Sequence, residues 1–264
     1  MIMERVKTGI SQLDEILHGG FLRGDSIMLG GPAGAGKTSL GLQFLVNGAT
    51  KFGENGIFVT FEQLPDQLYR DAKSFGWDLR KLEEEGKILV VCTSPKLLVG
   101  AEAEPSILED SIKQIRPKRI VIDSLSHLAL IIEHPDLRRR EVYRLIMYLK
   151  SKGLTSMFTS EGSVVLPSTG AGLSFLADCV IALRLVEIES SMRKALVLLK
   201  MRGSDHDKSL THFEVTSNGI EILKPFAHYT GVFTGSPSGF LSDRENDSQG
   251  NSGPSQARAL STRN

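Results

Sequence analysis

Short apolar runs rich in β-branched residues alternate, through the first 160 residues, with longer segments whose apolar side chains recur at helical spacing. The first pattern predicts buried strands and the second predicts amphipathic helices. The predicted strands are Ser26–Leu29, Gly56–Phe61, Lys87–Val91, Arg119–Asp123 and Leu154–Thr159, and the predicted helices are Ser39–Val46, Leu64–Phe75, Pro105–Arg116 and Asp136–Lys152. Such alternation indicates a parallel sheet that is covered by helices on both faces.

The rhythm changes in the last third of the chain, where strand-like runs follow one another without helices between them. Asp178–Val186 and Lys194–Lys200 flank a Glu-Ser-Ser turn, and Thr211–Val215 and Ile220–Leu223 flank a Ser-Asn-Gly turn. Both pairs are typical of antiparallel hairpins. We therefore predict an α/β fold with a mostly parallel central sheet, flanked by helices, and C-terminal antiparallel hairpins.

Beyond about Gly231 the sequence turns to Gly, Ser, Pro, Asn and Asp with scattered charge. A segment of this composition buries too little apolar surface to hold a fixed structure. We expect one domain over residues 1–230, without internal repeats, and a flexible tail over residues 231–264.

The charge balance is neutral, with 31 basic and 31 acidic side chains. No global positive field is therefore expected to attract nucleic acid or an anionic membrane. Cys92 and Cys179 lie in separate strand-like runs without metal-ligand spacing, so we expect two buried, reduced thiols. The N-terminus is charged where a secretory signal would be apolar, and no apolar run reaches the roughly 18 residues of a membrane span. The expectation is a soluble, cytoplasmic protein.

The segment Gly31–Thr38 reads GPAGAGKT and fits the phosphate-loop pattern G-x-x-x-x-G-K-[ST] between a predicted strand and a predicted helix. In such loops backbone N–H groups surround the phosphates of a nucleoside triphosphate, the lysine reaches the β and γ oxygens and the hydroxyl ligates Mg²⁺. We therefore assign nucleotide binding to Gly34, Ala35, Gly36, Lys37, Thr38 and Ser39. Lys37 is also expected to act in catalysis.

Two carboxylates end other predicted strands. Asp123 closes Arg119–Asp123 and is the candidate partner of Thr38 in the Mg²⁺ site, although an aspartate that caps the next helix would look the same. Glu62 follows Gly56–Phe61, and on a strand next to the loop strand it could orient or deprotonate the attacking water. The alternative for Glu62 is a plain surface glutamate at a strand end.

Lys200 and Arg202 stand two residues apart at the end of a predicted strand, so both side chains would project from the same face. Two adjacent cations are reasonable where a polyanion arrives between them, and the alternative is the solvated end of a hairpin. Periodicity does not reveal whether the phosphates would belong to the same subunit or to a neighbour.

With these motifs in place the chain resembles the RecA superfamily and, within it, the KaiC family of clock ATPases and their single-domain relatives. The segments that carry the resemblance are Thr8-Gly9-Ile10, Leu13-Asp14, His18-Gly19-Gly20, Gln43-Phe44-Leu45, Asn47-Gly48, Phe58–Glu62, Ser74–Leu79 and Lys200–His206.

The resemblance implies ATP with Mg²⁺, and adenine rather than guanine is inferred from it alone. It also implies a homo-oligomer, a hexameric ring with ATP between subunits. Lys200 and Arg202 would then reach the γ-phosphate of the neighbour's ATP, with Met201, Ser204 and His206 lining the nucleotide from the same side. Ser74 would contact the nucleotide from the loop-bearing subunit.

Two positions depart from the family pattern. The family has two adjacent glutamates where this chain has Glu62-Gln63, so one carboxylate of the pair is replaced by an amide. Where the clock protein phosphorylates an adjacent Ser-Thr pair, this chain has Ser174-Phe175, so only a serine could accept phosphate.

Three functions remain open. The leading hypothesis is a ring-forming ATPase whose nucleotide state controls subunit packing and hence binding of an unknown protein partner, with serine autokinase activity at Ser174 as an additional hypothesis. A DNA-dependent recombination ATPase needs basic or aromatic loops, and the candidate loop Glu161–Gly170 contains neither, while the basic run Arg138–Arg140 reads as a solvated or interface face. The third function is an ATP-bound scaffold that does not hydrolyse.

Overall fold

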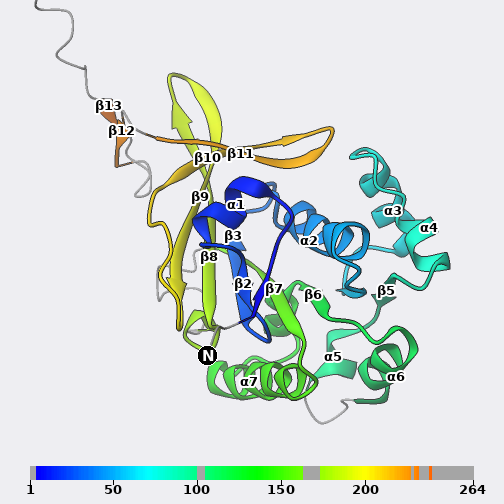
Figure 1. Ribbon diagram of the computed structural model, residues 1–264. Coiled ribbons are helices and arrows are strands. Elements are labelled where there is room, and N and C mark those ends of the chain that lie inside the picture. Colours follow the sequence, from blue (N-terminus) through cyan, green and yellow to red (C-terminus); the bar gives the residue numbers. More distant parts are fainter. Residues whose placement is uncertain (1–3, 100–104, 163–172, 227–228, 232–237, 240–264) are drawn as a thin grey trace, which may run out of the picture.

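The computed structural model describes residues 4–99, 105–162, 173–226, 229–231 and 238–239. Its main sheet has nine strands in the order β11-β10-β9-β8-β3-β7-β6-β4-β5 (Figure 1). The strands are β3 (Ser26–Gly31), β4 (Gly56–Thr60), β5 (Ile88–Cys92), β6 (Arg119–Asp123), β7 (Thr155–Glu161), β8 (Cys179–Ile188), β9 (Ser191–Met201), β10 (Thr211–Thr216) and β11 (Gly219–Pro225). The strands from β8 to β5 are parallel, whereas β9, β10 and β11 pair antiparallel. The predicted mixed sheet is confirmed.

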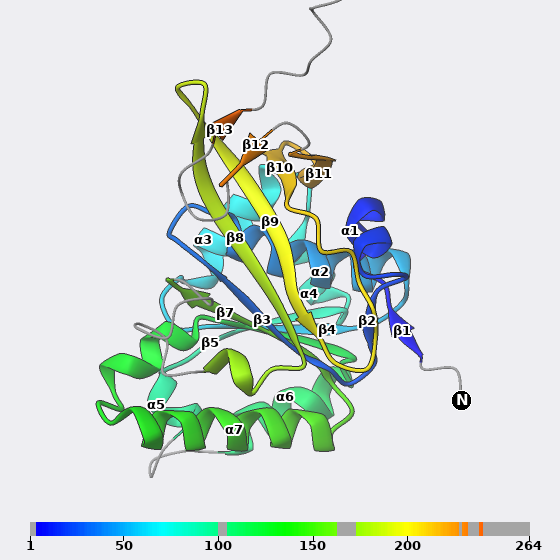
Figure 2. The same cartoon turned by 90° about the vertical axis from the view of Figure 1, so that its left-hand side faces the viewer.

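Helices cover both faces of the parallel part of the sheet (Figure 2). The first layer comprises α1 (Ser11–Ile16), α2 (Lys37–Lys51), α3 (Pro65–Lys73) and α4 (Leu79–Glu84). The second comprises α5 (Pro95–Leu98), α6 (Pro105–Ile115), the 3₁₀ helix η1 (Leu125–Leu130) and α7 (Pro135–Ser151). The remaining elements are the 3₁₀ turn η2 (Leu173–Phe175) and the short strands β1 (Arg5–Val6), β2 (Phe21–Leu22), β12 (Tyr229–Thr230) and β13 (Ser238–Gly239). Because apolar side chains leave water on both faces of the sheet, the two helix layers create two hydrophobic cores.

Close packing fixes α2 against the sheet. A Cβ atom on Gly48 would lie 2.6 Å from Nε of Arg119, so only glycine lets the buried arginine of β6 pass under the helix. The Arg119 guanidinium donates to the Phe44 carbonyl oxygen at 2.9 Å and pairs with Glu54 at 2.5 Å. A buried charge needs such partners to offset its desolvation. The contact holds the loop helix on the strand that ends in Asp123.

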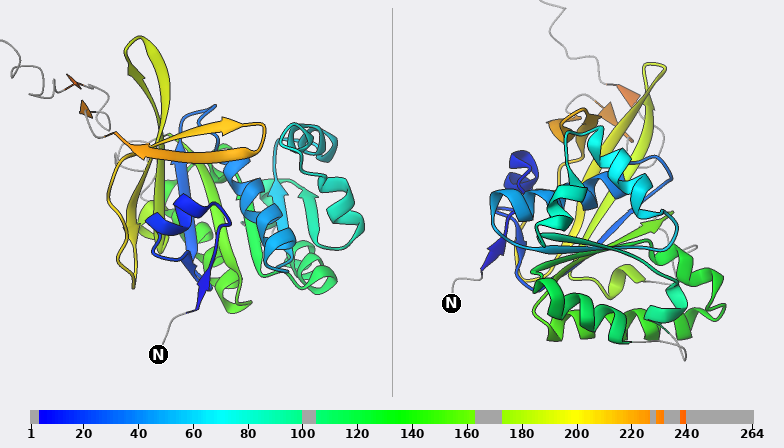
Figure 3. Two further views of the ribbon diagram at one scale, coloured as in Figure 1. Left: turned by 45° about the horizontal axis from the view of Figure 1, so that its top comes forward. Right: turned by 90° about the vertical axis from the view of Figure 1, so that its right-hand side faces the viewer.

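The hairpin of β10 and β11 lies across the start of α2 and alongside α1 (Figure 3). A Cβ atom added at Gly36 would lie 3.4 Å from Val215 and 3.6 Å from Ile220 and from Phe213. The antiparallel end of the sheet therefore packs directly on the phosphate loop.

Two predictions from the sequence are wrong. β4 is separated from β3 by β7 and β6, so Glu62 does not follow a neighbour of the loop strand. The order of strands in the sheet depends on how the connections between them cross it, and the pattern of apolar residues along the chain does not encode that order. Cys92 is exposed because it ends the edge strand β5, whereas Cys179 is buried as expected.

Most of the predicted tail, residues 232–237 and 240–264, lies outside the described residues. In the part of the chain that the structure describes, no helix combines the length and apolarity needed to cross a bilayer.

Candidate functional site

The phosphate loop connects β3 to α2, as the sequence predicts. Gly34 and Gly36 have φ values of +73° and +99°, a region that L side chains rarely adopt. Gly36 is the N-cap of α2, and Ala35 beside it is buried. The loop therefore presents backbone N–H groups at a helix N-terminus, where the helix dipole favours anions.

Lys37 is the first residue of α2 and its side chain turns back over the loop. Its Nζ donates to the carbonyl oxygens of Gly31 and Pro32, both at 2.9 Å. Burial lowers the pKa of this ammonium, and the carboxylates of Glu161 and Asp123 oppose the shift. A partly desolvated cation in this position interacts strongly with a phosphate oxygen.

Thr38 and Asp123 meet as predicted. The Thr38 hydroxyl donates to Oδ2 of Asp123 at 2.7 Å, and the Thr159 hydroxyl donates to Oδ1 of the same carboxylate. Thr159 lies near the carboxyl end of β7, which separates β3 from β6. Sequence reasoning missed it, although a polar residue at the end of a predicted strand was the available signal.

A pocket of about 430 Å³ opens beside the first turn of α2. Its polar lining includes Thr38 and Ser39 from the loop helix and Arg70 and Ser74 from α3 and its C-cap. Gln63 also lines the pocket, and its buried Oε1 finds no hydrogen-bond partner among the described residues. The structure thus places Ser74 in one pocket with Thr38 and Ser39, and leaves one buried acceptor free to bind a donor.

Glu62 lies just beyond β4 with 76% of its side chain exposed. Its Oε2 is 3.4 Å from Nε2 of His127 in η1, and Nδ1 of His127 is 3.2 Å from the Ser124 hydroxyl. β4 and β6 pair with each other, with Thr60 opposite Asp123. The Glu62 and His127 side chains, which follow these strands, therefore lie at the same end of the sheet. His127 and Ser124 were missed because no motif spacing marks them.

Two further charged residues lie close to the loop, one on β9 and one at the end of β7. The Lys194 ammonium of β9 donates to the Gly34 carbonyl oxygen at 2.5 Å. Glu161 ends β7 directly opposite Gly31. The chain therefore supplies a second cation to its own loop, a contribution that the sequence did not reveal.

Lys200 and Arg202 lie toward the opposite end of the strands, where the parallel strands begin. β9 runs antiparallel to β8, and Lys200 pairs with Val180, which is level with Met28 of β3. Lys200 Nζ donates to the Ala177 carbonyl oxygen at 2.6 Å. The Arg202 guanidinium donates to the Phe175 carbonyl oxygen at 3.0 Å.

The two cations therefore gather at one short segment, as their spacing predicts. Burial, and then the charge of Arg202, lowers the pKa of Lys200. Asp178 lies 3.6 Å from Arg202 and 2.5 Å from Lys150, and its carboxylate provides part of the compensating charge. This end of the strands is not adjacent to the phosphate loop of the same chain.

The other residues predicted for the neighbour-facing side follow the same strand end. Met201 is buried in the core, and Ser204 accepts a hydrogen bond from Arg5 at 2.6 Å. His206 has a buried Nδ1 without a hydrogen-bond partner in the described part of the chain. The structure groups these residues with Lys200 and Arg202, away from Gly34–Ser39.

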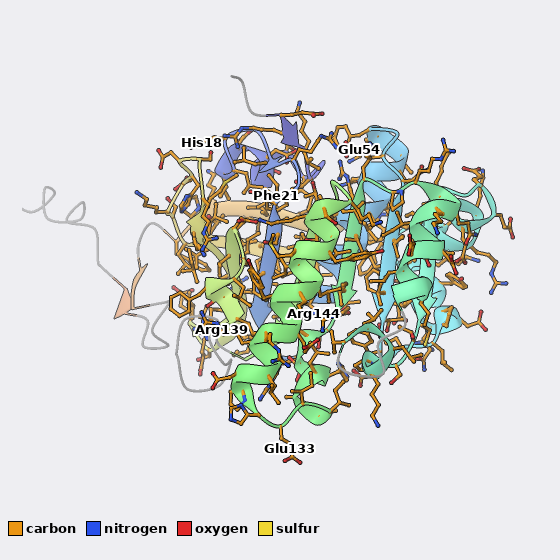
Figure 4. The ribbon with its side chains drawn as sticks, turned by 90° about the horizontal axis from the view of Figure 1, so that it is seen from below. His18, Phe21, Glu54, Glu133, Arg139 and Arg144 are labelled. Carbon is orange, nitrogen blue, oxygen red and sulfur yellow. The ribbon has the colours of Figure 1, made fainter. Side chains whose placement is uncertain are left out.

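Two arginines of the basic run in α7, Arg138 and Arg140, have hydrogen-bond or ion-pair partners. Arg140 and Arg144 contact the Glu141 carboxylate at 3.5 and 2.9 Å, and Arg138 donates to the Glu133 carbonyl oxygen. Figure 4 looks onto α7 and shows Arg139 and Arg144 on its surface. Arg140 and Arg144 thus share one carboxylate of their own helix, which is compatible with the solvated face that the sequence predicts.

The donor set fits a nucleoside triphosphate with Mg²⁺. Hydroxyl and carboxylate oxygens from Thr38 and Asp123 suit a hard cation that completes its shell with phosphate oxygens and water. The described residues contain no cluster of three or more His, Cys, Asp or Glu side chains able to hold a metal. Fold and loop together define a RecA-like P-loop domain.

Comparison with known proteins identifies the family. The family model described as "ATPase: KaiC" matches residues 6–226. The chain is 37% identical over 228 residues to the circadian clock oscillator protein KaiC of Synechococcus elongatus, covering 83% of this chain and 44% of that protein. It is 36% identical over 235 residues to a UPF0273 protein of Methanocaldococcus jannaschii, covering 83% of this chain and 96% of the relative. The chain belongs to the KaiC ATPase family.

A solved structure agrees. The crystal structure of a KaiC-like protein from Pyrococcus horikoshii OT3 superposes with a TM-score of 0.76 at 35% identity, covering 84% of this chain and all of the other. The chain spans about half the length of the clock proteins that it matches, 44% for the Synechococcus KaiC and 46% for KaiC3 of Synechocystis.

Proposed function

We propose that this protein binds Mg²⁺-ATP at Gly31–Thr38 and hydrolyses it within a homo-oligomeric ring, a hexamer by resemblance, in the cytoplasm. The observation that carries the proposal is the contact between Thr38 and Asp123 at 2.7 Å, at the carboxyl edge of the parallel strands. Ligands of open α/β sheets bind at this edge. Residues 1–230 form the ATPase domain in this proposal.

The residues have distinct roles. The N–H groups of Gly34–Ser39 hold the phosphates, Lys37 binds the β and γ oxygens, and Ser74 contacts the nucleotide from the adjoining pocket. Thr38 and Asp123 would hold Mg²⁺, which neutralises charge on the phosphates when bound. Glu62 accepts the proton of the water that attacks the γ-phosphorus, and the bond from that phosphorus to the β–γ bridging oxygen breaks as ADP leaves.

Lys200 and Arg202 complete the site of a neighbouring subunit in this proposal, with Met201, Ser204 and His206 beside them. The support is their position on the edge opposite their own phosphate loop. A ring places unlike edges of successive subunits against each other, which is a heterologous contact. Nucleotide state then alters subunit packing and hence binding of a protein partner.

The test compares steady-state ATP turnover of the wild type with Lys37→Ala and Glu62→Gln. We expect Lys37→Ala to abolish nucleotide binding or turnover, and Glu62→Gln to keep binding while lowering turnover by roughly 10²–10⁴-fold, the usual range for a general base. Turnover insensitive to Glu62→Gln would reject the base. Binding with negligible turnover in the wild type would favour the scaffold, and turnover that requires added DNA would favour the recombination ATPase.

One observation favours a second activity, transfer of the γ-phosphoryl group to Ser174. The Ser174 carbonyl oxygen lies 3.4 Å from Nζ of Lys200, so a neighbour's phosphate that reached Lys200 would also approach the Ser174 hydroxyl. Mass spectrometry after incubation with ATP tests this hypothesis, because phosphate must appear on Ser174 and disappear in Ser174→Ala.

A further inference from the structure

The side chain of Glu62 is exposed, and the residues next to it in the chain do little to fix its orientation. Its backbone N–H and that of Gln63 donate to the Thr60 hydroxyl at 3.3 and 3.1 Å, which fixes the turn after β4. The side chain, however, is 76% exposed. An exposed glutamate samples many rotamers, and a general base must be held within hydrogen-bond reach of the water that it deprotonates.

His127 supplies a contact to this side chain from a different strand end. Its Nε2 lies 3.4 Å from Oε2 of Glu62, and only a quarter of the His127 side chain is exposed. The imidazole also packs edge-on to Phe61, with ring centroids 6.1 Å apart. Its position is therefore determined by packing rather than by the solvent-exposed carboxylate.

The element that carries His127 is anchored on two sides. The His127 N–H donates to the Ser124 carbonyl oxygen at 3.2 Å within the first turn of η1. On the other side, the Ser126 hydroxyl accepts the Glu161 N–H of β7 at 2.7 Å. η1 thus stands on β6 and β7 while Glu62 follows β4, so the imidazole can act as a fixed reference for the carboxylate.

Ser124 contacts the other nitrogen of the His127 ring. The Ser124 hydroxyl lies 3.2 Å from Nδ1, and the same residue's carbonyl oxygen lies 3.3 Å from it. When the hydroxyl donates to Nδ1, the neutral ring carries its proton on Nε2 and directs an N–H toward Glu62. The opposite tautomer would let Nδ1–H donate to the Ser124 carbonyl oxygen but would place the Nε2 lone pair against the carboxylate, which is repulsive.

We propose that His127 is a positioning residue that holds the Glu62 carboxylate toward the γ-phosphate. The inference rests on the proposed function. In the reaction the water oxygen bonds to the γ-phosphorus, its proton passes to Glu62, and the electron pair of the broken bond stays on the bridging oxygen of ADP. His127 does not exchange a proton in this scheme. It limits the orientations of the base.

The experiment uses the full-length chain and measures kcat and KM for Mg²⁺-ATP, with ATP affinity by equilibrium binding and thermal stability as parallel readouts. Four variants are compared with the wild type: His127→Ala, His127→Gln, Glu62→Gln and the double variant His127→Ala/Glu62→Gln. His134→Ala is the matched control, since His134 also faces a carboxylate, Asp136 at 4.0 Å, but precedes α7.

We expect His127→Ala to lower kcat by roughly 10–100-fold, part of the range available to a general base, with ATP affinity and stability unchanged. His127→Gln keeps an amide N–H near the position of Nε2 and should restore most of the rate. In the Glu62→Gln background His127→Ala should have no further effect, because the group it positions is gone.

Two results would overturn the inference alone, given turnover that depends on Glu62: an unchanged kcat in His127→Ala, or an equal loss in both Glu62 backgrounds. Absence of turnover in the wild type, or turnover insensitive to Glu62→Gln, would instead reject the proposed function, and the inference with it. The two failures are therefore distinguishable.

Discussion

Lys200 and Arg202 are too far from their own phosphate loop to act on it. Lys200 is level with Met28, three residues before Gly31, and two strands away from it. At ~3.3 Å per residue and ~4.8 Å per strand the two backbones are about 14 Å apart. The cationic groups point to the Ala177 and Phe175 carbonyl oxygens, so a phosphate that they bind should belong to another subunit.

The perturbation pairs two inactive variants. Lys37→Ala lacks the loop cation, and Arg202→Ala lacks the arginine proposed to reach the neighbour's γ-phosphate, here called the finger. Each should be inactive alone, since an arginine at a γ-phosphate contributes roughly 10³–10⁵ in rate. In a ring assembled at random from equal amounts, about one quarter of the interfaces join an intact loop to an intact finger, because each interface uses one edge of each subunit. Activity per subunit should therefore recover to about one quarter of the wild type.

The assay co-expresses the two variants with different affinity tags, purifies mixed assemblies over both tags and measures phosphate release. A matched control mixes Arg202→Ala with the double variant Lys37→Ala/Arg202→Ala, which offers intact loops but no intact finger. Arg193→Ala tests an exposed arginine at the other end of β9 and should behave as wild type. Mixed assemblies no more active than their parents, or failure of the subunits to co-purify, would refute the trans arrangement.

Two further predictions concern single side chains. Burial raises the pKa of Asp25 to about 7, so the folded state holds this proton more tightly than the unfolded state and stability is lost as pH rises from about 4 to about 7. Asp25→Asn should reduce this pH dependence and raise the free energy of unfolding at pH 8 by about 1–2 kcal/mol, after allowance for solvent screening. Urea unfolding midpoints at pH 5 and pH 8 measure the effect. The same change in midpoint between the two pH values in both proteins would contradict the prediction. Thr159→Val removes the hydroxyl that donates to Asp123, and the loss of a hydrogen bond to a charged group should raise the Mg²⁺ concentration for half-maximal turnover roughly 10–100-fold, whereas Thr155→Val at the other end of β7 should leave it unchanged.

Much of the fold follows from local patterning. Buried strands such as Arg119–Asp123 read as continuous apolar runs because both faces of the sheet are covered. The turn residues Glu189 and Ser190 have positive φ, and a hairpin between β8 and β9 follows where the sequence predicts it. The contact between Thr38 and Asp123 could also be predicted. Thr38 lies just beyond the end of one parallel strand and Asp123 ends another, and these strand ends lie on the same side of the sheet.

Other features depend on the spatial order of the strands in the sheet. β7 lies between β3 and β6, so Thr159 reaches Asp123 and Glu62 is displaced from the loop strand. The contact of His127 with Glu62 needs β4 and β6 side by side, and residues separated by 65 positions carry no mutual signal in one sequence. Similarly, only the antiparallel register of β9 places Lys194 on the phosphate loop and Lys200 on the far edge.

The sequence by itself determined the phosphate loop, the strand and helix types and the carboxylate that joins Thr38, because each depends on residues close in the chain or on a shared strand end. The tertiary structure decided which other side chains surround that loop and which edge the cationic pair occupies. The physical reason is that strand order and register are set by packing of the whole sheet against its two helix layers, where each contact depends on segments far apart in the chain.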